Sequence, residues 1–509
     1  MYRALCILAI LLWATVSVWG GVGASISGTV LDAQGAVVPN ATVTLVNPAT
    51  NVRQTIVTDD KGIYSFRGLG VGTYELQVSA AGFKPYRRTA ISADANDALI
   101  VDVALVVGQQ SETITVRQSP VTVDTASTQL GEVITGSTVD AVPLNGRSFT
   151  DLLALQPGVA PETTISGTSV QAAGASTFSP SGYLNPGTIS INGQREYANG
   201  FTVNDADVVE RFTMGAAVVP NLDSISEFRV LTGNFNAEYG NYSGGRINVI
   251  TKSGANQFHG SAFEFLRNTD LDAKNFFSSS RGAFQQNQYG GTFGGPVIKN
   301  KIFFYVDYQG TSLKQGVDTG DIAVPSDQDR TGNLTDLAST LTGTVNGQNW
   351  ADQLAQRLGY TVTPGEAYYY AGCTTSAQCV LPNAVIPQTA FSAPANALLK
   401  YIPAANSGVD TFSTSAEDLL LRDKKGSLRL DGNTRWGMLS SYYFLDDYSV
   451  NNPYPTQQGG ANVPGFNAMN NGRSQLLTLG DTKAIGSRSV NEVHFSFVRD
   501  VNILSLIHI

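Results

Sequence analysis

Apolar and polar residues alternate in short runs through residues 25–107, and turn residues separate the runs. Tyr64 and Phe66 in one run, and Tyr74, Leu76 and Val78 in another, recur at a period of two. This period sends alternate side chains to opposite faces of a β-strand, so that one face can be buried. About seven such strands in about 80 residues predict a small antiparallel β-sandwich.

Residues 121–255 mix short helix signals with short strand signals. Residues 148–156 predict a short helix with Leu152, Leu153 and Leu155 on its apolar face. The same region predicts, in chain order, a β-hairpin at residues 189–203, a short helix entering a strand at residues 221–230, and a strand at residues 246–251. These signals therefore predict an α+β domain for this part of the chain.

Longer alternating strands begin at His259. Ile302 and Phe304 share one face of a strand, and Asp307 and Gln309 share the other. The predicted connections alternate between short turns and long polar segments: residues 296–301, 431–434 and 486–487 against residues 268–283, 314–425 and 449–472. Short turns on one side and long loops on the other are typical of an outer-membrane β-barrel. A soluble sandwich with loop insertions is the less favoured alternative.

The apolar run at residues 4–20 follows Arg3 and precedes small residues that end at Ala24. A basic start, an apolar stretch and a small-residue site are typical of a secretory signal peptide. An uncleaved membrane anchor is the rival interpretation, but a spanning helix needs about 20 apolar residues. We therefore expect export with removal of residues 1–24.

Export would leave two of the chain's 3 cysteines, Cys373 and Cys379. Two thiols this close in sequence, in an oxidising compartment, predict a disulfide that closes a small loop. Metal binding is the weaker alternative, because no His lies nearby.

The composition argues against several function classes. A formal net charge of -9 disfavours a nucleic-acid partner, because phosphate binding needs clustered Lys and Arg. The 3 His are scattered and form no recognisable triad or metal motif. We expect no enzyme activity and no cofactor.

Several motifs in chain order resemble a known family. The run GGRINVITKSG from Gly244 is similar to the closing strand of the plug domain in TonB-dependent outer-membrane receptors, and PLNGRSFTDLLALQPGV and FRVLTGNFNAEYG extend the match. The run DDKGIYSFRGLGVGTYELQVSAAGF resembles carboxypeptidase regulatory-like domains, which implies no peptidase here. Together these features resemble the Oar-like branch of that family.

The resemblance implies a mainly β fold with three parts: an N-terminal transthyretin-like β-sandwich, an α+β plug domain, and the first part of an antiparallel transmembrane β-barrel. The expected ranges are a signal peptide at 1–24, the sandwich at 25–107, a linker at 108–120, the plug at 121–255, a partial barrel at 256–503 and a foreign, adapter-derived tail at 504–509. Receptors of this type need about 22 strands to close around a plug, and we count about seven after His259. We therefore expect the chain to be a fragment.

The implied function is energy-coupled transport of an unidentified extracellular ligand, such as a saccharide, a siderophore or a peptide, by a protein embedded in outer-membrane lipid. The linker residues Glu112, Thr113, Ile114, Thr115 and Val116 resemble the TonB box, which a periplasmic TonB-type protein captures by strand addition. A linker strand that packs on the sandwich is the alternative interpretation of the same residues.

Polar residues in the family-like motifs are candidates for plug function: Arg147, Arg195, Glu227, Glu238 and Arg246. Ordinary surface or plug–wall salt bridges are the alternative role of each. A cell-surface carbohydrate-binding or adhesion protein that uses the sandwich is the second function class.

The signal-peptide interpretation predicts the N-terminus of the exported protein. Mass spectrometry of the mature chain should find its first residue near Ser25, because the small residues that end at Ala24 fit the cleavage site. Retention of residues 1–20 in exported protein would contradict removal by this route.

Overall fold

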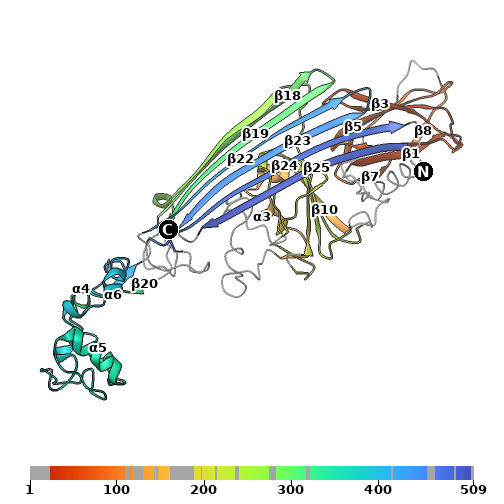
Figure 1. The fold of residues 1–509 in the computed structure, drawn as a ribbon. Helices are drawn as coiled ribbons and strands as arrows, with labels where there is room; N and C mark the ends of the chain where they lie inside the picture. The colour runs from red at the N-terminus through yellow and green to blue at the C-terminus, as the bar shows by residue number, and fades with distance from the viewer. Residues whose placement is uncertain are drawn as a thin grey trace, which may run out of the picture.

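A computed structural model describes most of the chain. The described residues are 23–108, 114–117, 130–142, 144, 147–160, 189–195, 198–211, 215–235, 240–273, 283–316, 321–413, 417–454, 465–485 and 489–505. Seven long strands form a curved wall, the sandwich lies at one end of it, and a small helical excursion lies at the other end (Figure 1). None of the described helices has the length and apolar character needed to cross a membrane.

The N-terminal domain is a β-sandwich of two sheets, as its alternating pattern predicts. One sheet holds β4 (Ile63–Leu69), β1 (Ala24–Asp32), β7 (Ala98–Ile100) and β8 (Val103–Leu105); the other has the order β3 (Val52–Val57), β2 (Thr42–Asn47), β5 (Gly72–Ser79), β6 (Tyr86–Ala93) and β9 (Ile114–Arg117). Ile26, Tyr64, Leu76 and Ile91 are buried between the sheets. The domain is not wholly antiparallel, since β7 and β8 run parallel to β1 and β9 runs parallel to β6.

The plug domain is built on a second sheet. Its strand order is β10 (Leu130–Thr135), β15 (Ile225–Gly233), β16 (Arg246–Thr251), β13 (Gly200–Val203) and β14 (Ala206–Asp207). The short helices α2 (Gly136–Ala141), α3 (Thr150–Leu153) and η2 (Leu222–Ser224) and the paired strands β11 (Val159–Ala160) and β12 (Ser190–Ile191) complete it. Phe149, Leu152, Phe228 and Ile247 lie in its core.

Two local predictions for the plug are wrong. Residues 189–203 do not form a hairpin, because β12 pairs with β11 whereas β13 pairs with β14 and β16. Leu155 is exposed, although Leu152 and Leu153 are buried, because α3 ends at Leu153. The hairpin is replaced by pairing with strands farther away in the chain, because β12 pairs with β11 and β13 pairs in parallel with β16.

The third sheet is an open antiparallel wall of seven strands in chain order. They are β17 (His259–Asn268), β18 (Phe284–Ile298), β19 (Ile302–Gly316), β22 (Asp418–Asn433), β23 (Met438–Asn452), β24 (Ala468–Ile485) and β25 (Ser489–Ser505). The predicted short turns and long connections fall between these strands, so the outer-membrane barrel pattern is confirmed as an unclosed sheet with β17 and β25 at its edges.

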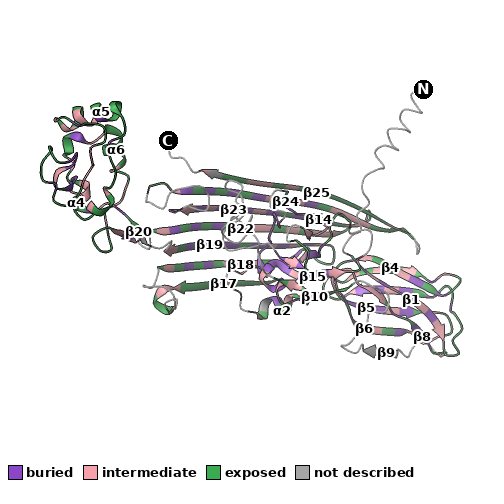
Figure 2. Ribbon diagram, turned by 90° about the horizontal axis from the view of Figure 1, so that it is seen from below, coloured by how far each residue is buried: buried purple, intermediate pink, exposed green. Residues whose placement is uncertain are grey.

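The wall exposes apolar side chains on one side, and its buried side carries polar residues together with apolar ones. Val493, Phe495 and Phe497 are each more than half exposed, whereas Asp307 and Gln309 are buried. Buried and exposed residues alternate along the wall strands (Figure 2). In a soluble sheet the apolar face is buried, whereas here an apolar face is exposed. A barrel wall has this pattern because its outer face contacts lipid and its inner face contacts the plug.

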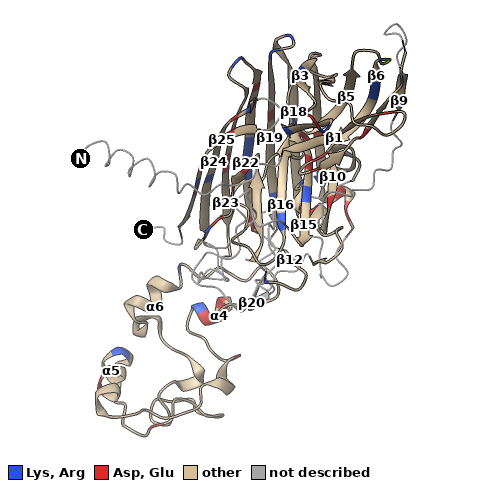
Figure 3. Cartoon of the chain, turned by 90° about the vertical axis from the view of Figure 1, so that its right-hand side faces the viewer, with Lys and Arg blue, Asp and Glu red and all other residues tan. Residues whose placement is uncertain are grey.

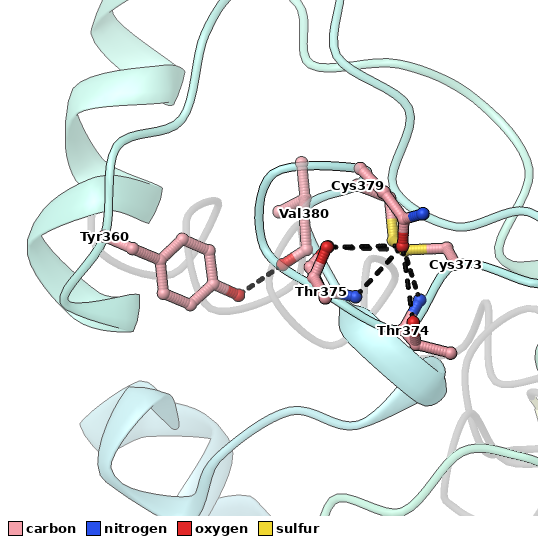
Figure 4. The surroundings of a disulfide bond; sticks show 7 residues. Tyr360, Cys373, Thr374, Thr375, Cys379 and Val380 are labelled. Atoms are coloured by element: carbon pink, nitrogen blue, oxygen red, sulfur yellow. Dashed lines mark hydrogen bonds between the residues drawn. A yellow bond between two sulfur atoms is a disulfide. The ribbon is translucent and has the colours of Figure 1, made fainter.

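The long connection after β19 folds into a small excursion of its own. It contains β20 (Asp321–Ala323), α4 (Asp327–Arg330), η5 (Ala338–Thr340), α5 (Gln348–Leu358), η6 (Pro382–Ala384), η7 (Gln388–Ala390), α6 (Ala393–Leu398) and β21 (Thr411–Ser413). Val345, Ala351 and Val380 belong to its core. The structure joins Cys373 and Cys379 in a disulfide, with 6.2 Å between their Cα atoms. Both cysteines are buried beside the Tyr360–Val380 hydrogen bond (Figure 4).

The disulfide predicts how the chain responds to thiol reagents. Without reductant, a maleimide should label neither Cys373 nor Cys379; after reduction it should label both, giving two adducts by mass spectrometry. The third cysteine, Cys6, lies within the expected signal peptide, so a third adduct would report that residues 1–24 remain. Ready labelling of either residue without reductant would contradict the pairing.

Candidate functional site

The plug is held by a contact with the sandwich. We call this contact the latch: it consists of Ala95 and Asp97 of the sandwich and of Glu227 and Arg229 of the plug strand β15. The Ala95 N–H donates to Glu227 Oε1. Arg229 Nη1 donates to the Ala95 carbonyl at 2.6 Å and to Asp97 Oδ1 at 3.1 Å. Both plug side chains are buried, so the latch is a closed polar contact between two domains.

Local sequence explains how the two halves of the latch are presented. On β15, Phe228 and Val230 enter the plug core, so the alternation of a strand turns Glu227 and Arg229 to the opposite face. The sandwich half is a tight turn after β6, in which the Asp97 N–H donates to the Asp94 carbonyl at 3.1 Å. Asn96 has φ of 60° in this turn, a conformation that Asn tolerates better than most residues.

Burial changes the acid–base behaviour of Glu227. Loss of water is the largest cause, and it raises the pKa of Glu227 from 4.5 to about 8. The hydrogen bond from Ala95 and the charge of Arg229 lower this pKa, whereas Asp94 and Asp97 raise it further. Glu227 is therefore mostly protonated at neutral pH, and Arg229 pairs instead with Asp97.

A second set of polar contacts joins the plug to the concave face of the wall. Asn221 Nδ2 and Ser427 Oγ both donate to the carboxylate of Asp307. Asp307 and Asn221 are buried, so the wall strand β19 and the plug are joined through a carboxylate that has lost most of its water.

Arg147 forms a further link between plug and wall. Its guanidinium pairs with Asp223, and it lies 4.3 Å and 4.5 Å from the ring centroids of Phe263 and Phe265 on β17. Tyr305 Oη of β19 donates to the Asp223 carbonyl at 2.9 Å. An arginine between a carboxylate and two aromatic faces is held by charge and by cation–π attraction.

The plug's last strand, β16, is fixed at both ends. At its start, a Cβ on Gly245 would lie 2.2 Å from Ile191 Cδ1 and 3.1 Å from the Leu231 carbonyl oxygen, so a larger residue would displace Ile191. At its last residue, Arg429 of the wall donates to the Thr251 carbonyl at 2.7 Å, and just after it Ser253 Oγ donates to Asp431 at 2.6 Å. The glycine pair thus packs the plug backbone closely, as the family motif implies.

The sequence-predicted residues fall in different places. Ile114, Thr115 and Val116 lie in β9, which pairs with β6 at the edge of the sandwich, whereas Glu112 and Thr113 lie outside the described residues. Glu238 also lies outside them.

The remaining plug candidates do not form one cluster. Glu227 belongs to the latch and Arg147 to the plug–wall contact, as described above. Arg246 is buried and donates to Asn248 at 3.1 Å within β16, and Arg195 is exposed. Figure 3 marks the basic residues of β15 and β16 among the plug strands.

Sequence reasoning missed Arg229, Arg429 and Asp307. A signal for Arg229 exists, because its spacing of two from Glu227 puts both on one strand face. The polar positions on β19 also signalled an inner face. No signal in the sequence identifies Ala95 and Asp97 as the partners, since they lie more than a hundred residues from β15.

Two family models match the chain. A model described as an outer membrane beta barrel domain matches residues 250–506, about half of the chain. A model described as a carboxypeptidase regulatory-like domain matches residues 25–106.

Similar proteins include a curated transporter and solved receptors. The TonB-dependent transporter Oar of Myxococcus xanthus is 30% identical over 302 residues, which cover 56% of this chain and 26% of the transporter. The siderophore receptor PirA from Acinetobacter baumannii has 17% identity and a TM-score of 0.34, covering 74% of this chain and 49% of the receptor. A ferric enterobactin receptor from Pseudomonas aeruginosa has 14% identity and a TM-score of 0.31, covering 75% and 50%. The chain thus spans about a quarter of the curated relative and half of these receptors.

The raised pKa of Glu227 predicts a pH-dependent latch. From pH 4.5 to about 8 the unfolded chain releases this proton while the folded chain keeps it, so the free energy of unfolding falls as pH rises. The slope is at most about 1.4 kcal/mol per pH unit. Glu227→Gln keeps a neutral acceptor for Ala95 and should remove this slope, giving a higher Tm than the parent at pH 8.

The matched control is Glu132→Gln, which removes an exposed carboxylate from the neighbouring strand β10. Thermal unfolding of the full chain in detergent, followed by circular dichroism across this pH range, measures all three proteins. Equal pH profiles for the parent and Glu227→Gln would show that Glu227 is not buried as a neutral acid.

Proposed function

The chain belongs to the outer-membrane β-barrel family, in the Oar-like group of TonB-dependent receptors, and on that premise we propose that it couples periplasmic energy to the movement of an extracellular ligand. An outer-membrane location follows from the family. The proposed partner is a TonB-type periplasmic protein, and the ligand is a saccharide, a siderophore or a peptide that enters from the side of the long loops.

The latch is the observation that carries this proposal, because it links the candidate TonB box to the plug. The box strand β9 pairs in register with β6, where Thr115 lies opposite Arg87. The end of β6 at Ala93 is separated from Ala95 by a single residue, and Ala95 contacts both Glu227 and Arg229. A pull on β9 is therefore transmitted along β6 to the plug strand β15.

Strand β9 suits capture by a partner that adds a strand. It is the last strand in the order β3-β2-β5-β6-β9, so its outer edge has no neighbour among the described strands of this sheet. A partner strand can pair with the free N–H and C=O groups of such an edge. A few main-chain hydrogen bonds at about 1 kcal/mol each give modest affinity, which suits a transient grip.

The same position explains how the two interpretations of residues 112–116 combine. At rest residues 114–117 form the strand that extends the sandwich, and during capture residues 112–116 serve as the box. The partner then grips the edge of a folded sheet rather than a free tether, so the whole sandwich moves with it. The hydrogen bonds at Asp307 and Thr251 hold the plug to the wall while the partner pulls on the latch.

Ile114→Pro tests the box. Proline removes a backbone N–H and fixes φ, so it should disrupt strand pairing and lower the affinity for the periplasmic TonB-type domain by at least about tenfold. Valine favours an extended backbone as much as threonine does, so Thr113→Val should leave the affinity unchanged. Titration calorimetry of that domain against the full chain in detergent measures both variants.

A melt of the same proteins separates capture from structural support. If residues 112–116 serve only to support the sandwich, Ile114→Pro should lower the Tm and leave the affinity for the partner intact. Unchanged binding by Ile114→Pro would therefore reject the box, whatever happens to the Tm.

A further inference from the structure

A crevice with a volume of about 550 Å³ lies between the sandwich and the short turns of the wall. Its sandwich side consists of residues 54–57 on β3 and of Arg67 on β4. Its wall side consists of the turn between β22 and β23, including Arg435, and of residues 482–484 at the end of β24. Its volume is in the range of sites that bind small molecules or lipid headgroups.

The lining of the crevice is basic. Arg67, Arg435 and Lys483 contribute three cations, and no Asp or Glu is among its described lining residues. Within the described part of the chain, none of the three forms a salt bridge: Arg67 Nε donates to Ser65 Oγ at 3.4 Å, and Arg435 lies 4.6 Å above the Trp436 ring. Three exposed cations in one lining attract an anion, although the carboxylate of Asp481 lies beside the lining residue Gly437.

The crevice lies at the edge of the lipid-facing surface of the wall. On β24, Lys483 shares its strand face with Leu479 and Ile485, which are 43% and 57% exposed. Trp436 in the adjoining turn is 59% exposed. Aromatic residues at the end of an apolar band mark the level of the lipid headgroups in outer-membrane barrels.

We propose that this crevice binds the phosphodiester headgroup of an anionic phospholipid in the periplasmic leaflet. The phosphate lies among Arg67, Arg435 and Lys483, and the acyl chains follow the apolar surface beside Leu479 and Ile485. Arginine and lysine are the usual ligands of phosphate. The lipid then bridges the sandwich and the wall, because Arg67 belongs to the sandwich whereas Arg435 and Lys483 belong to the wall.

The charge of the lining also sets the lipid class. A zwitterionic headgroup carries an ammonium group, and the described lining offers no carboxylate to receive it. The crevice therefore prefers phosphatidylglycerol to phosphatidylcholine. This inference needs only the membrane position of the wall and is independent of capture by a periplasmic partner.

Native mass spectrometry of the full chain in detergent doped with each lipid tests the site. The parent should retain one phosphatidylglycerol and little phosphatidylcholine. Arg435→Gln with Lys483→Gln should reduce that retention by roughly tenfold, the effect of losing at least one charge-assisted contact. The matched control is Lys299→Gln with Lys301→Gln, which removes the same charge from another short turn outside the crevice and should retain the lipid.

The remaining outcomes overturn the assignment. Equal loss in both double variants would show diffuse attraction by the basic turns rather than a site. Binding of inorganic phosphate that depends on Arg435 and Lys483, without retention of phosphatidylglycerol, would show a soluble-anion site instead of a lipid site. If the parent and the Arg435/Lys483 variant retain phosphatidylglycerol equally, and circular dichroism shows both to be folded, the crevice is not the lipid site.

Discussion

A polar surface is buried between the plug and the wall, and the need to pair its groups is the constraint on which the rest of the structure depends. A buried charge that loses its partner costs about 3–5 kcal/mol, so each such group fixes the position of its partner closely. Asp307 is fixed in this way by Asn221 and Ser427, and Arg147 holds the half-buried Asp223 less strongly. These pairs align the plug with the wall, because any shift of one against the other would leave several charged groups unpaired.

The same constraint explains why the wall strands are inverted relative to those of a soluble sheet. On β19 the buried face carries Asp307 and Gln309, whereas Tyr308 between them is 43% exposed. In water such a strand would be unstable, but lipid receives its apolar face and the plug satisfies its polar face. The plug therefore fills the concave side of the wall. Moving it requires breaking these polar contacts and also separating the apolar contact in which Tyr442, Phe444 and Leu476 of the wall join the plug core.

The sandwich is placed where it can act on that polar interface from one side. Its turn at residues 94–97 contacts the buried Glu227 and Arg229, and its edge strand β9 lies at the periphery of the same domain. Its other side faces the short turns of the wall across the basic crevice. The domain thus contacts the plug, which we propose must move, and lies beside the wall, so a pull on the sandwich strains the polar contacts between the plug and the wall.

The sequence by itself determined where most of the long strands lie. A period of two and the turn residues between strands are local properties, and they do not depend on how the strands pack. It also determined the strand at residues 246–251, the glycine pair before it, and the short and long connections of the wall. It misjudged residues 189–203, where β12 and β13 pair with distant strands rather than with each other. Only the tertiary structure decided that Glu227 and Arg229 meet Ala95 and Asp97, and that Arg67 joins Arg435 and Lys483. Such contacts join segments from different domains, and pairing between residues so far apart depends on how whole sheets pack, which no local pattern encodes.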